Sequence, residues 1–238
     1  SQSDNQVNML RVDNTFSGLN LLMPLGVRNT LRIRTGTVNT TEAAMLSLGD
    51  STNTGILSTD PSNTQWWPET PYAGNLASWD GGYVNGPFRR WFTGTTVGQE
   101  KIMPVGDSND LHPVAVDFED TQGGYLTAHF IDEQPGISGL PLIDEQNTDI
   151  GFVSPDGFWK MTAENVSGSY DITVNASGFT RDGVHPIGGL SDVRLIKRPS
   201  AGNWQLSGST TMSGPSSLSN VRADSLNGFS DFGIGMGC

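Results

Sequence analysis

The sequence predicts an all-β protein: an antiparallel β-sandwich, of jelly-roll or immunoglobulin-like topology, with an N-terminal extended arm. Turn-forming residues are frequent, with 30 Gly and 13 Pro among 238 residues. Apolar residues occur in short runs that often alternate with polar ones, which is the period of a half-buried strand, and helical spacing is hard to find anywhere. A β-domain of this length has ample room for a core.

The chain is expected to divide into an arm, residues 1–17, and a β-sandwich domain, residues 18–238. The arm begins with polar residues and then carries an apolar patch formed by Val7, Met9, Leu10 and Val12. Such an arm either docks on its own domain or adds as a strand to a neighbouring subunit, where backbone hydrogen bonds supply affinity and alternate side chains fill pockets. Both alternatives stay open.

After the arm, glycine-containing turns separate short strand-like runs. Leu31 and Ile33 alternate with Arg32 and Arg34, which predicts a half-buried strand with the guanidinium groups on the polar face. The strands expected here are residues 18–23, 30–35 and 44–48.

Residues 58–80 form a loop too long for an ordinary connector, and it is rich in aromatic residues. Trp66, Trp67, Tyr72 and Trp79 lie in it. Exposed rings in a loop stack on sugars, so these residues are candidate glycan contacts. The alternative is that the rings plug one end of the sandwich or a contact between subunits.

The segment 81–107 is expected to form a seam, because the sequence before it is polar and weakly apolar whereas longer alternating runs follow it. The domain is therefore expected to be two-lobed. Arg89 and Arg90 are adjacent on a predicted strand and point to opposite faces, so at least one of them is expected to pair with a carboxylate. Core or sheet contacts are expected from Tyr83, Val84, Phe88 and Trp91.

Two hairpins are predicted beyond the seam. The first joins 111–118 to 124–131, and the second joins 157–162 to 169–176. Further strands are expected at 193–197, 203–207 and 230–235. The core candidates are Leu126, Ala128, Phe130, Trp159, Met161, Ile172 and Val174.

The charge balance restricts the classes of partner that the protein is expected to bind. Thirteen basic and 25 acidic residues give a formal net charge of −12, which opposes binding to phosphate backbones or anionic membranes. We therefore expect no nucleic-acid partner and, since no apolar run reaches the length of a membrane span, no membrane insertion. The one cysteine, Cys238, permits no internal disulfide.

No motif of a hydrolase elbow, phosphate loop, dinucleotide fold or zinc protease is present, so the protein is predicted not to be an enzyme and to need no cofactor. Calcium is the one metal considered, because Asp107, Asn109 and Asp110 form a short oxygen-rich loop. Formation of an Asx turn explains the same residues equally well.

An ordered set of motifs resembles a β-sandwich module that is common in secreted and cell-surface proteins of Bacteroidota. The resemblance covers most of residues 18–235. Its motifs are Gly36-Thr-Val-Asn-Thr-Thr, Met45-Leu-Ser-Leu-Gly49, Gly82-Tyr-Val-Asn-Gly-Pro-Phe-Arg-Arg-Trp91, Met103-Pro-Val-Gly-Asp107, Tyr125-Leu-Thr-Ala, Gly157-Phe-Trp-Lys, Val193-Arg-Leu-Ile-Lys-Arg198 with Trp204, and Gly228-Phe-Ser-Asp-Phe-Gly-Ile-Gly235.

The resemblance implies export by the type IX route and an extracellular or cell-surface location, as in adhesin-like proteins. Such modules usually continue into further domains, whereas this sequence ends at Cys238, so a trimmed product or a small assembling subunit is expected. The resemblance also implies O-glycosylation at Asp-Ser sequences, which makes Ser51 and Ser225 candidate acceptors.

The function expected is that of an extracellular structural subunit. It would assemble head to tail into a surface filament, a homopolymer in which the N-terminal arm completes a neighbour's sheet. The alternative is a glycan-binding or adhesive, non-catalytic module of a larger surface protein, with surface glycans as partners.

Overall fold

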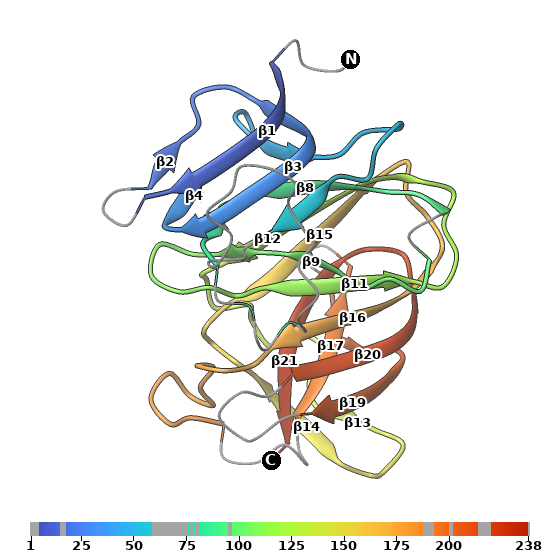
Figure 1. Cartoon of the computed structure of the whole chain (residues 1–238). Coiled ribbons are helices and arrows are strands. Elements are labelled where there is room, and N and C mark those ends of the chain that lie inside the picture. Colours follow the sequence, from blue (N-terminus) through green and yellow to red (C-terminus); the bar gives the residue numbers. More distant parts are fainter. Residues whose placement is uncertain are drawn as a thin grey trace.

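A computed structural model of the chain describes residues 5–14, 18–58, 76, 79, 81–94, 97–187, 193–199, 202–213 and 220–237. Its regular elements are all strands, which confirms the all-β class (Figure 1). They form three sheets of 12, four and five strands.

The large sheet runs in order from β1 to β13. Its strands are β1 (Gln6–Asp13), β3 (Leu25–Thr35), β5 (Leu46–Leu48), β6 (Ile56–Ser58), β8 (Phe88–Phe92), β12 (Gly124–Ile131), β13 (Leu142–Ile143), β14 (Asp149–Val153), β15 (Phe158–Glu164), β17 (Val193–Arg198), β18 (Gln205–Leu206) and β21 (Asp231–Gly237). The four-stranded sheet holds β2 (Leu19–Asn20), β4 (Thr37–Asn39), β7 (Tyr83–Asn85) and β10 (Val105–Gly106). The five-stranded sheet holds β9 (Lys101–Met103), β11 (Val114–Phe118), β16 (Ser169–Asn175), β19 (Ser209–Ser213) and β20 (Asn220–Asn227).

The N-terminal half is a short parallel solenoid, which the sequence did not predict. Strands β1, β3, β5 and β8 pair in parallel in the large sheet, and β2, β4, β7 and β10 pair in parallel in the small one. The chain alternates between these two sheets, so each rung, which is one strand in each sheet, stacks on the next. Stacked rungs of this kind bury a continuous core that no single rung can bury alone.

Two ladders of asparagine side chains tie the rungs together. At the ends of β2, β4 and β7, Asn85 Nδ2 donates to Asn39 Oδ1 at 3.1 Å, and Asn39 Nδ2 donates to Asn20 Oδ1 at 2.7 Å. In a second ladder, Asn53 Nδ2 donates to Asn29 Oδ1 in β3, and Asn29 Nδ2 donates to Asn8 Oδ1 in β1, at 2.5 and 2.6 Å. The first ladder follows the register of parallel strands, with Asn20 opposite Asn39 and Asn39 opposite Asn85, whereas the second passes the register shift between Val7 and Met9.

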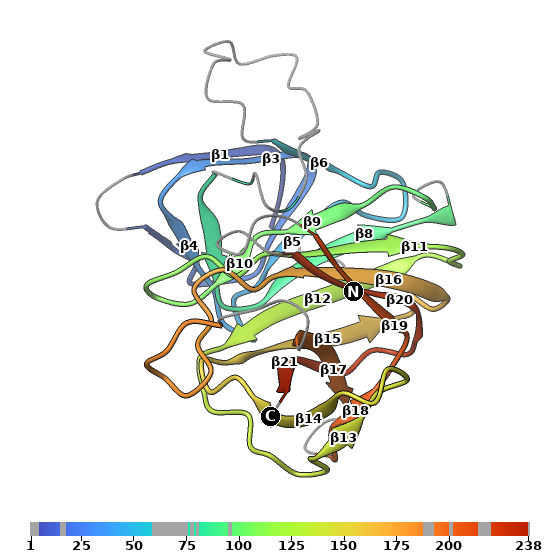
Figure 2. The same cartoon turned by 90° about the horizontal axis from the view of Figure 1, so that it is seen from below.

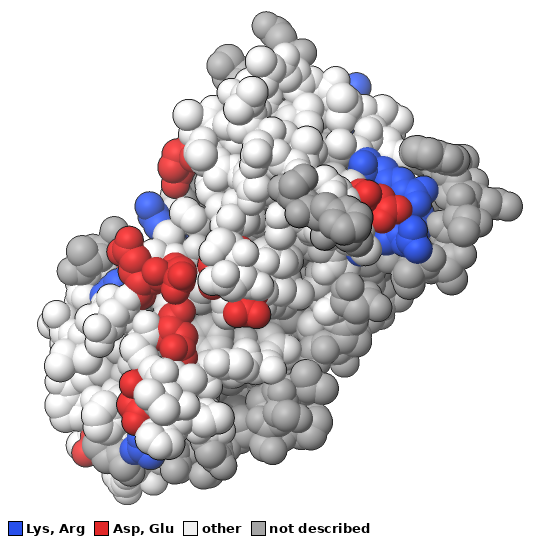
Figure 3. Space-filling model, turned by 90° about the vertical axis from the view of Figure 1, so that its left-hand side faces the viewer, with Lys and Arg blue, Asp and Glu red and all other residues white. Residues whose placement is uncertain are grey.

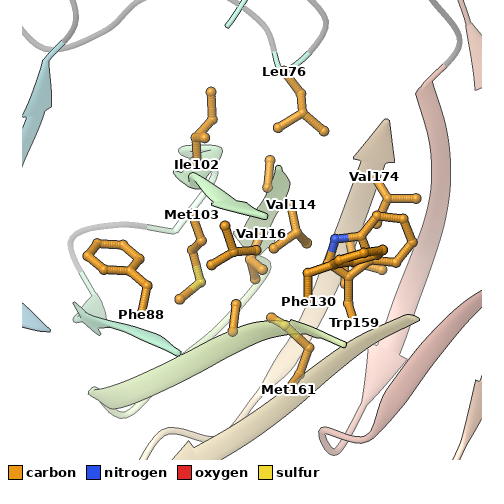
Figure 4. Packing of buried hydrophobic residues seen from close by; sticks show 14 of the residues in the cluster. Leu76, Phe88, Ile102, Met103, Val114, Val116, Phe130, Trp159, Met161 and Val174 are labelled. Carbon is orange, nitrogen blue, oxygen red and sulfur yellow. The ribbon is translucent and has the colours of Figure 1, made fainter. Parts of the chain in front are cut away.

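The C-terminal half is an antiparallel sandwich, as expected. Pairing changes from parallel to antiparallel at β8, which has β5 on one side and β12 on the other. The five-stranded sheet packs against the large sheet, and Figure 2 shows the two layers edge on. In the core between them, Met103 and Val116 face Phe88 and Met161, and Trp159 lies beside Phe130 (Figure 4).

Both predicted hairpins are wrong, although their strands exist. β11 pairs with β9 and β16 in the five-stranded sheet, whereas β12 pairs with β8 and β15 in the large one. β15 and β16 are divided between the sheets in the same way. The links cross from one layer to the other, and positive φ values at Gly123 and Gly124 (90° and 155°) turn the chain there. Alternation identifies the buried face of a strand but not its neighbour.

The burial pattern agrees with the sequence at most of the core positions. Arg32 is an exception, because it is 1% exposed although it was expected on a polar face. The predicted core residues Leu126, Ala128, Phe130, Trp159, Met161, Ile172 and Val174 are all buried, as are Val84 and Phe88, while Tyr83 and Trp91 are half-buried.

The asparagine ladder makes a prediction about stability. Replacing Asn39 by Ala removes two side-chain hydrogen bonds and is expected to lower the free energy of unfolding by about 1–2 kcal/mol, because each such bond contributes about 1 kcal/mol. Asn20→Ala, which removes one bond at the end of the ladder, should cost about half as much. Chemical denaturation of the two variants checks this, and equal losses would contradict the ladder.

Candidate functional site

The molecule has open strand edges at opposite ends of its large sheet. β1 pairs only with β3, and β13 pairs only with β14, among the described residues. β1 lies at one end and β13 with β14 at the other in both views (Figures 1 and 2). Unpaired backbone groups at a sheet edge are a template for another strand, so each end is a candidate interface.

The arm is the edge strand of its own sheet. The structure describes its residues 5–14, and β1 pairs in parallel with β3, with Leu10 opposite Leu31 and Val12 opposite Ile33. Of the predicted assembly residues, Val12 is buried, Met9 and Leu10 are half-buried, and Val7 is 37% exposed. Docking on its own domain, one of the two alternatives, is therefore the arrangement in the structure, and the outer edge of β1 is what the arm presents.

We call the open end of the solenoid the head: the edges of β1 and β2 that no other described strand pairs with, together with the exposed side chains of Val7, Leu22 and Met23. Leu22 and Met23, in the turn from β2 to β3, are 91% and 57% exposed. The Met23 sulfur accepts a hydrogen bond from Asn5 Nδ2 at 3.2 Å, which places this turn beside the start of β1. Exposed apolar side chains grouped at an open edge are typical of an interaction surface.

We call the opposite end the tail: the free edge of β13 with Ile137, Ile143 and Phe152. These side chains are 65%, 69% and 45% exposed. A separate small core formed by Ile150, Val153, Ile196 and Trp204 supports this end.

A cavity of about 320 Å³ lies on the outer face of the large sheet beside β1. On one side Arg28 pairs with buried Asp50 at 3.0 Å, and on the other Arg89 pairs with Glu164 at 2.7 Å, which confirms that one of the two adjacent arginines has a carboxylate partner. The Arg89 guanidinium also covers the Tyr125 ring at 4.1 Å.

The tyrosine in this cavity is held in place on two sides. The Tyr125 hydroxyl donates to the Gly49 carbonyl at 3.0 Å, and its ring meets Trp91 edge-on with centroids 4.7 Å apart. Burial raises the pKa of Tyr125, so the hydroxyl stays protonated. The cavity thus combines aromatic and charged groups, which is a composition suited to hydroxyl-rich ligands.

The predicted aromatic loop contributes little to this surface. Trp66, Trp67 and Tyr72 lie outside the described residues. Trp79 is described, but it is 6% exposed and belongs to the main hydrophobic core. Its position leaves little of the ring to stack on a sugar.

The oxygen-rich loop has the geometry of an Asx turn. Asp107 Oδ1 accepts the backbone N–H groups of Asn109 and Asp110 at 2.6 and 2.9 Å, and Oδ2 lies 3.3 Å from His112 Nε2. Burial acts to raise the pKa of Asp107, but the backbone hydrogen bonds and the nearby histidine outweigh it and lower the pKa. Both oxygens of this candidate calcium ligand therefore already have partners within the protein.

Both candidate O-glycosylation sites are exposed. Ser51 follows buried Asp50 in a turn and lines the cavity beside β1. Ser225 has a φ of 56°, and its Oγ donates to Glu119 Oε1 at 3.1 Å.

The charged side chains are sparse and grouped. On the face drawn in Figure 3 most of the surface is uncharged, the acidic atoms gather mainly over one half, and the largest basic group encloses acidic atoms. No cluster of three metal-ligating side chains occurs among the described residues. Within the same residues no helix is long and apolar enough to cross a membrane.

Comparisons of the chain with protein-family models, curated proteins and solved structures gave no match. The geometry of the chain itself therefore carries the functional argument. The open solenoid end is the feature that the sequence analysis missed, and the signal for it was the repeat of Gly-x-Val-Asn at Gly36–Asn39 and Gly82–Asn85.

Two histidines, buried His112 and half-buried His129, predict how stability depends on pH. Burial lowers the pKa of His112 below 6.5 against the opposing charge of Asp107, and burial also lowers the pKa of His129. The unfolded chain then binds more protons than the folded one just below pH 6.5, so stability should fall as pH drops from 7 to 5.

Denaturant unfolding across this pH range checks the expectation. His112→Gln should reduce the loss of folding free energy between pH 7 and pH 5, and His129→Gln should reduce it by a separate amount. The control is the range above about pH 7.5, where both histidines are neutral in the folded and the unfolded chain and neither substitution should change the slope. An unchanged slope in His112→Gln would contradict the assignment.

Proposed function

We propose that the protein is an exported structural subunit that assembles head to tail into a filament at the cell surface. The observation that carries the assembly is the course of the large sheet, whose open edges β1 and β13 lie at opposite ends of the molecule. Export and the surface location rest on the resemblance to secreted modules of Bacteroidota.

Two different surfaces at opposite ends form a heterologous contact. Such a contact leaves a free head and a free tail on every oligomer, so it propagates into a filament unless the rotation closes a ring. In this arrangement the arm supplies the edge strand of the contact. The outer backbone N–H and C=O groups of β1 pair with a strand of the neighbouring subunit. The added strand gains affinity from main-chain hydrogen bonds and specificity from side chains on both faces.

The exposed apolar side chains agree with this arrangement. Val7 and Leu22 at the head, and Ile143 at the tail, would exchange contact with water for contact with the neighbour. Burial of this kind contributes about 25 cal/mol per Å² of apolar surface, which assists a contact that is built on backbone pairing.

A glycan-binding, adhesive module is the second candidate, and the cavity beside β1 favours it. Arg28 is half exposed at the rim, where its remaining N–H groups are free to meet hydroxyl groups after Nε has paired with Asp50. Arg28→Ala is expected to abolish retardation of the protein by an immobilised polysaccharide in affinity electrophoresis, while Val97→Glu, at an exposed position that does not line the cavity, leaves it unchanged. If no polysaccharide of a broad panel retards the wild type, this candidate fails.

Head-to-tail assembly predicts complementation between two defective variants. The head variant carries Val7→Glu and Leu22→Glu, and the tail variant carries Ile143→Glu. Each variant alone is expected to stay monomeric, because a charge at a sheet edge opposes strand addition. Mixed together they should form dimers and nothing larger, since one intact head and one intact tail remain.

Light scattering and electron microscopy measure the outcome. Val97→Glu is the matched control and should form filaments like the wild type, because Val97 is exposed but lies at neither end. Melting curves establish that all variants are folded. Filaments from the head variant, or a mixture that stays monomeric, would rule out the heterologous contact.

A further inference from the structure

We propose that the head is an acceptor for a further parallel β-rung, a polypeptide segment that places asparagine side chains over Asn8 and Asn20. The inference goes beyond the proposed function because it names a different occupant of the head: a parallel rung with asparagine at two positions, whereas the tail strand β13, Leu142–Ile143, carries none.

Both asparagine ladders point their donors toward the head. In each one the inner amide donates to the Oδ1 of the next amide outward, and the last acceptors are Asn8 and Asn20. The Nδ2 groups of these two residues have no hydrogen-bond partner in the part of the chain that the structure describes, and both side chains are exposed. An asparagine on an added rung would accept from each of them and continue the pattern.

The inner ends of the ladders are closed. Asn85 lies opposite Gly106, which has no side chain, and a Cβ atom at Gly106 would come within 2.3 Å of the Asp110 carbonyl oxygen. In the other ladder Asn53 Oδ1 already accepts the backbone N–H of Gly55 at 2.9 Å. Both ladders can therefore grow in one direction only, outward from the head.

The apolar stacks of the solenoid end at the same place. Leu19 faces Val38, which faces Val84, and Val84 faces Val105 along the small sheet. The three valines are fully buried, whereas Leu19 in the outermost rung is half-buried. A further rung would complete the burial of Leu19, and that of Leu10 in the large sheet.

The incoming segment is defined by these features. It must run parallel to β1, because all strand pairs of the solenoid are parallel and their hydrogen bonds are evenly spaced. It must also carry asparagine at two positions and apolar residues between them. The β3–β4 rung of this chain, residues 25–39, has this pattern, with Asn29 inside β3 and Asn39 at the end of β4.

A peptide with the sequence of residues 25–39 is therefore the probe. Fluorescence anisotropy of the labelled peptide with the full chain should show saturable binding. Hydrogen exchange should slow at the amides of the outer edge of β1, because paired edge amides are protected. The same peptide with Asn29→Ala and Asn39→Ala is the matched control, and each substitution should weaken binding about fivefold, the effect of one lost hydrogen bond.

A tethered segment tests the inference even when the free peptide binds too weakly to be measured. The segment is fused to the N-terminus of the chain through a Gly/Ser linker, which raises its effective concentration to the millimolar range. The fusion should melt at a higher temperature than the fusion with both asparagines replaced, and Asn8→Ala or Asn20→Ala in the acceptor should remove part of that gain.

Equal binding of the peptide and its alanine control, or no gain in melting temperature and no protection of β1 in the fusion, would overturn the inference. Both rung experiments use the tail variant Ile143→Glu, whose head stays unoccupied whether or not the wild type assembles, so the two proposals fail separately.

Discussion

The structure depends on β8, which joins a parallel and an antiparallel set of strands within one sheet. On one side it pairs in parallel with β5 and on the other antiparallel with β12. Phe88 and Phe92 are completely buried, and buried Arg90 donates to the Ile102 carbonyl at 2.7 Å. Because the hydrogen-bonded sheet continues through β8, the solenoid and the sandwich share one core, and the position of the head is fixed relative to the tail.

The parallel half is stabilised by repetition more than by any single contact. Each rung is short, and β2 has only two residues, so a rung by itself buries too little surface to fold. Stacking joins the three outer rungs by two ladders of amides, and all four rungs by a column of aliphatic side chains in the small sheet. Inner rungs have neighbours on both sides, whereas the outermost rung has one among the described residues, and the proposals about the head rest on this asymmetry.

Sequence patterns predicted the strands and their buried faces but not the partners of the strands. The alternation of Leu126, Ala128 and Phe130 is a local property, so it identified the core face of β12 correctly. Which strand lies beside β12 depends on links that cross between layers, and no local pattern reports that. The parallel pairing was signalled by the repeated Gly-x-Val-Asn, since a side chain that stacks on its own kind must recur once per rung. The cavity beside β1 combines residues from six separate segments, which is why no motif pointed to it.

Gly106, which lies opposite Asn85, limits where rungs can be added to the solenoid. Because Gly106 lies opposite Asn85 and no side chain fits there, the asparagine ladder ends where the solenoid meets the sandwich. At the head, no described residue ends the ladder in this way. A rung inserted between β7 and β10 would have to replace the contact between Asn85 and Gly106. A rung added outside β1 and β2 would leave every existing strand pair in place. The number of rungs would therefore set how far the solenoid extends from the sandwich.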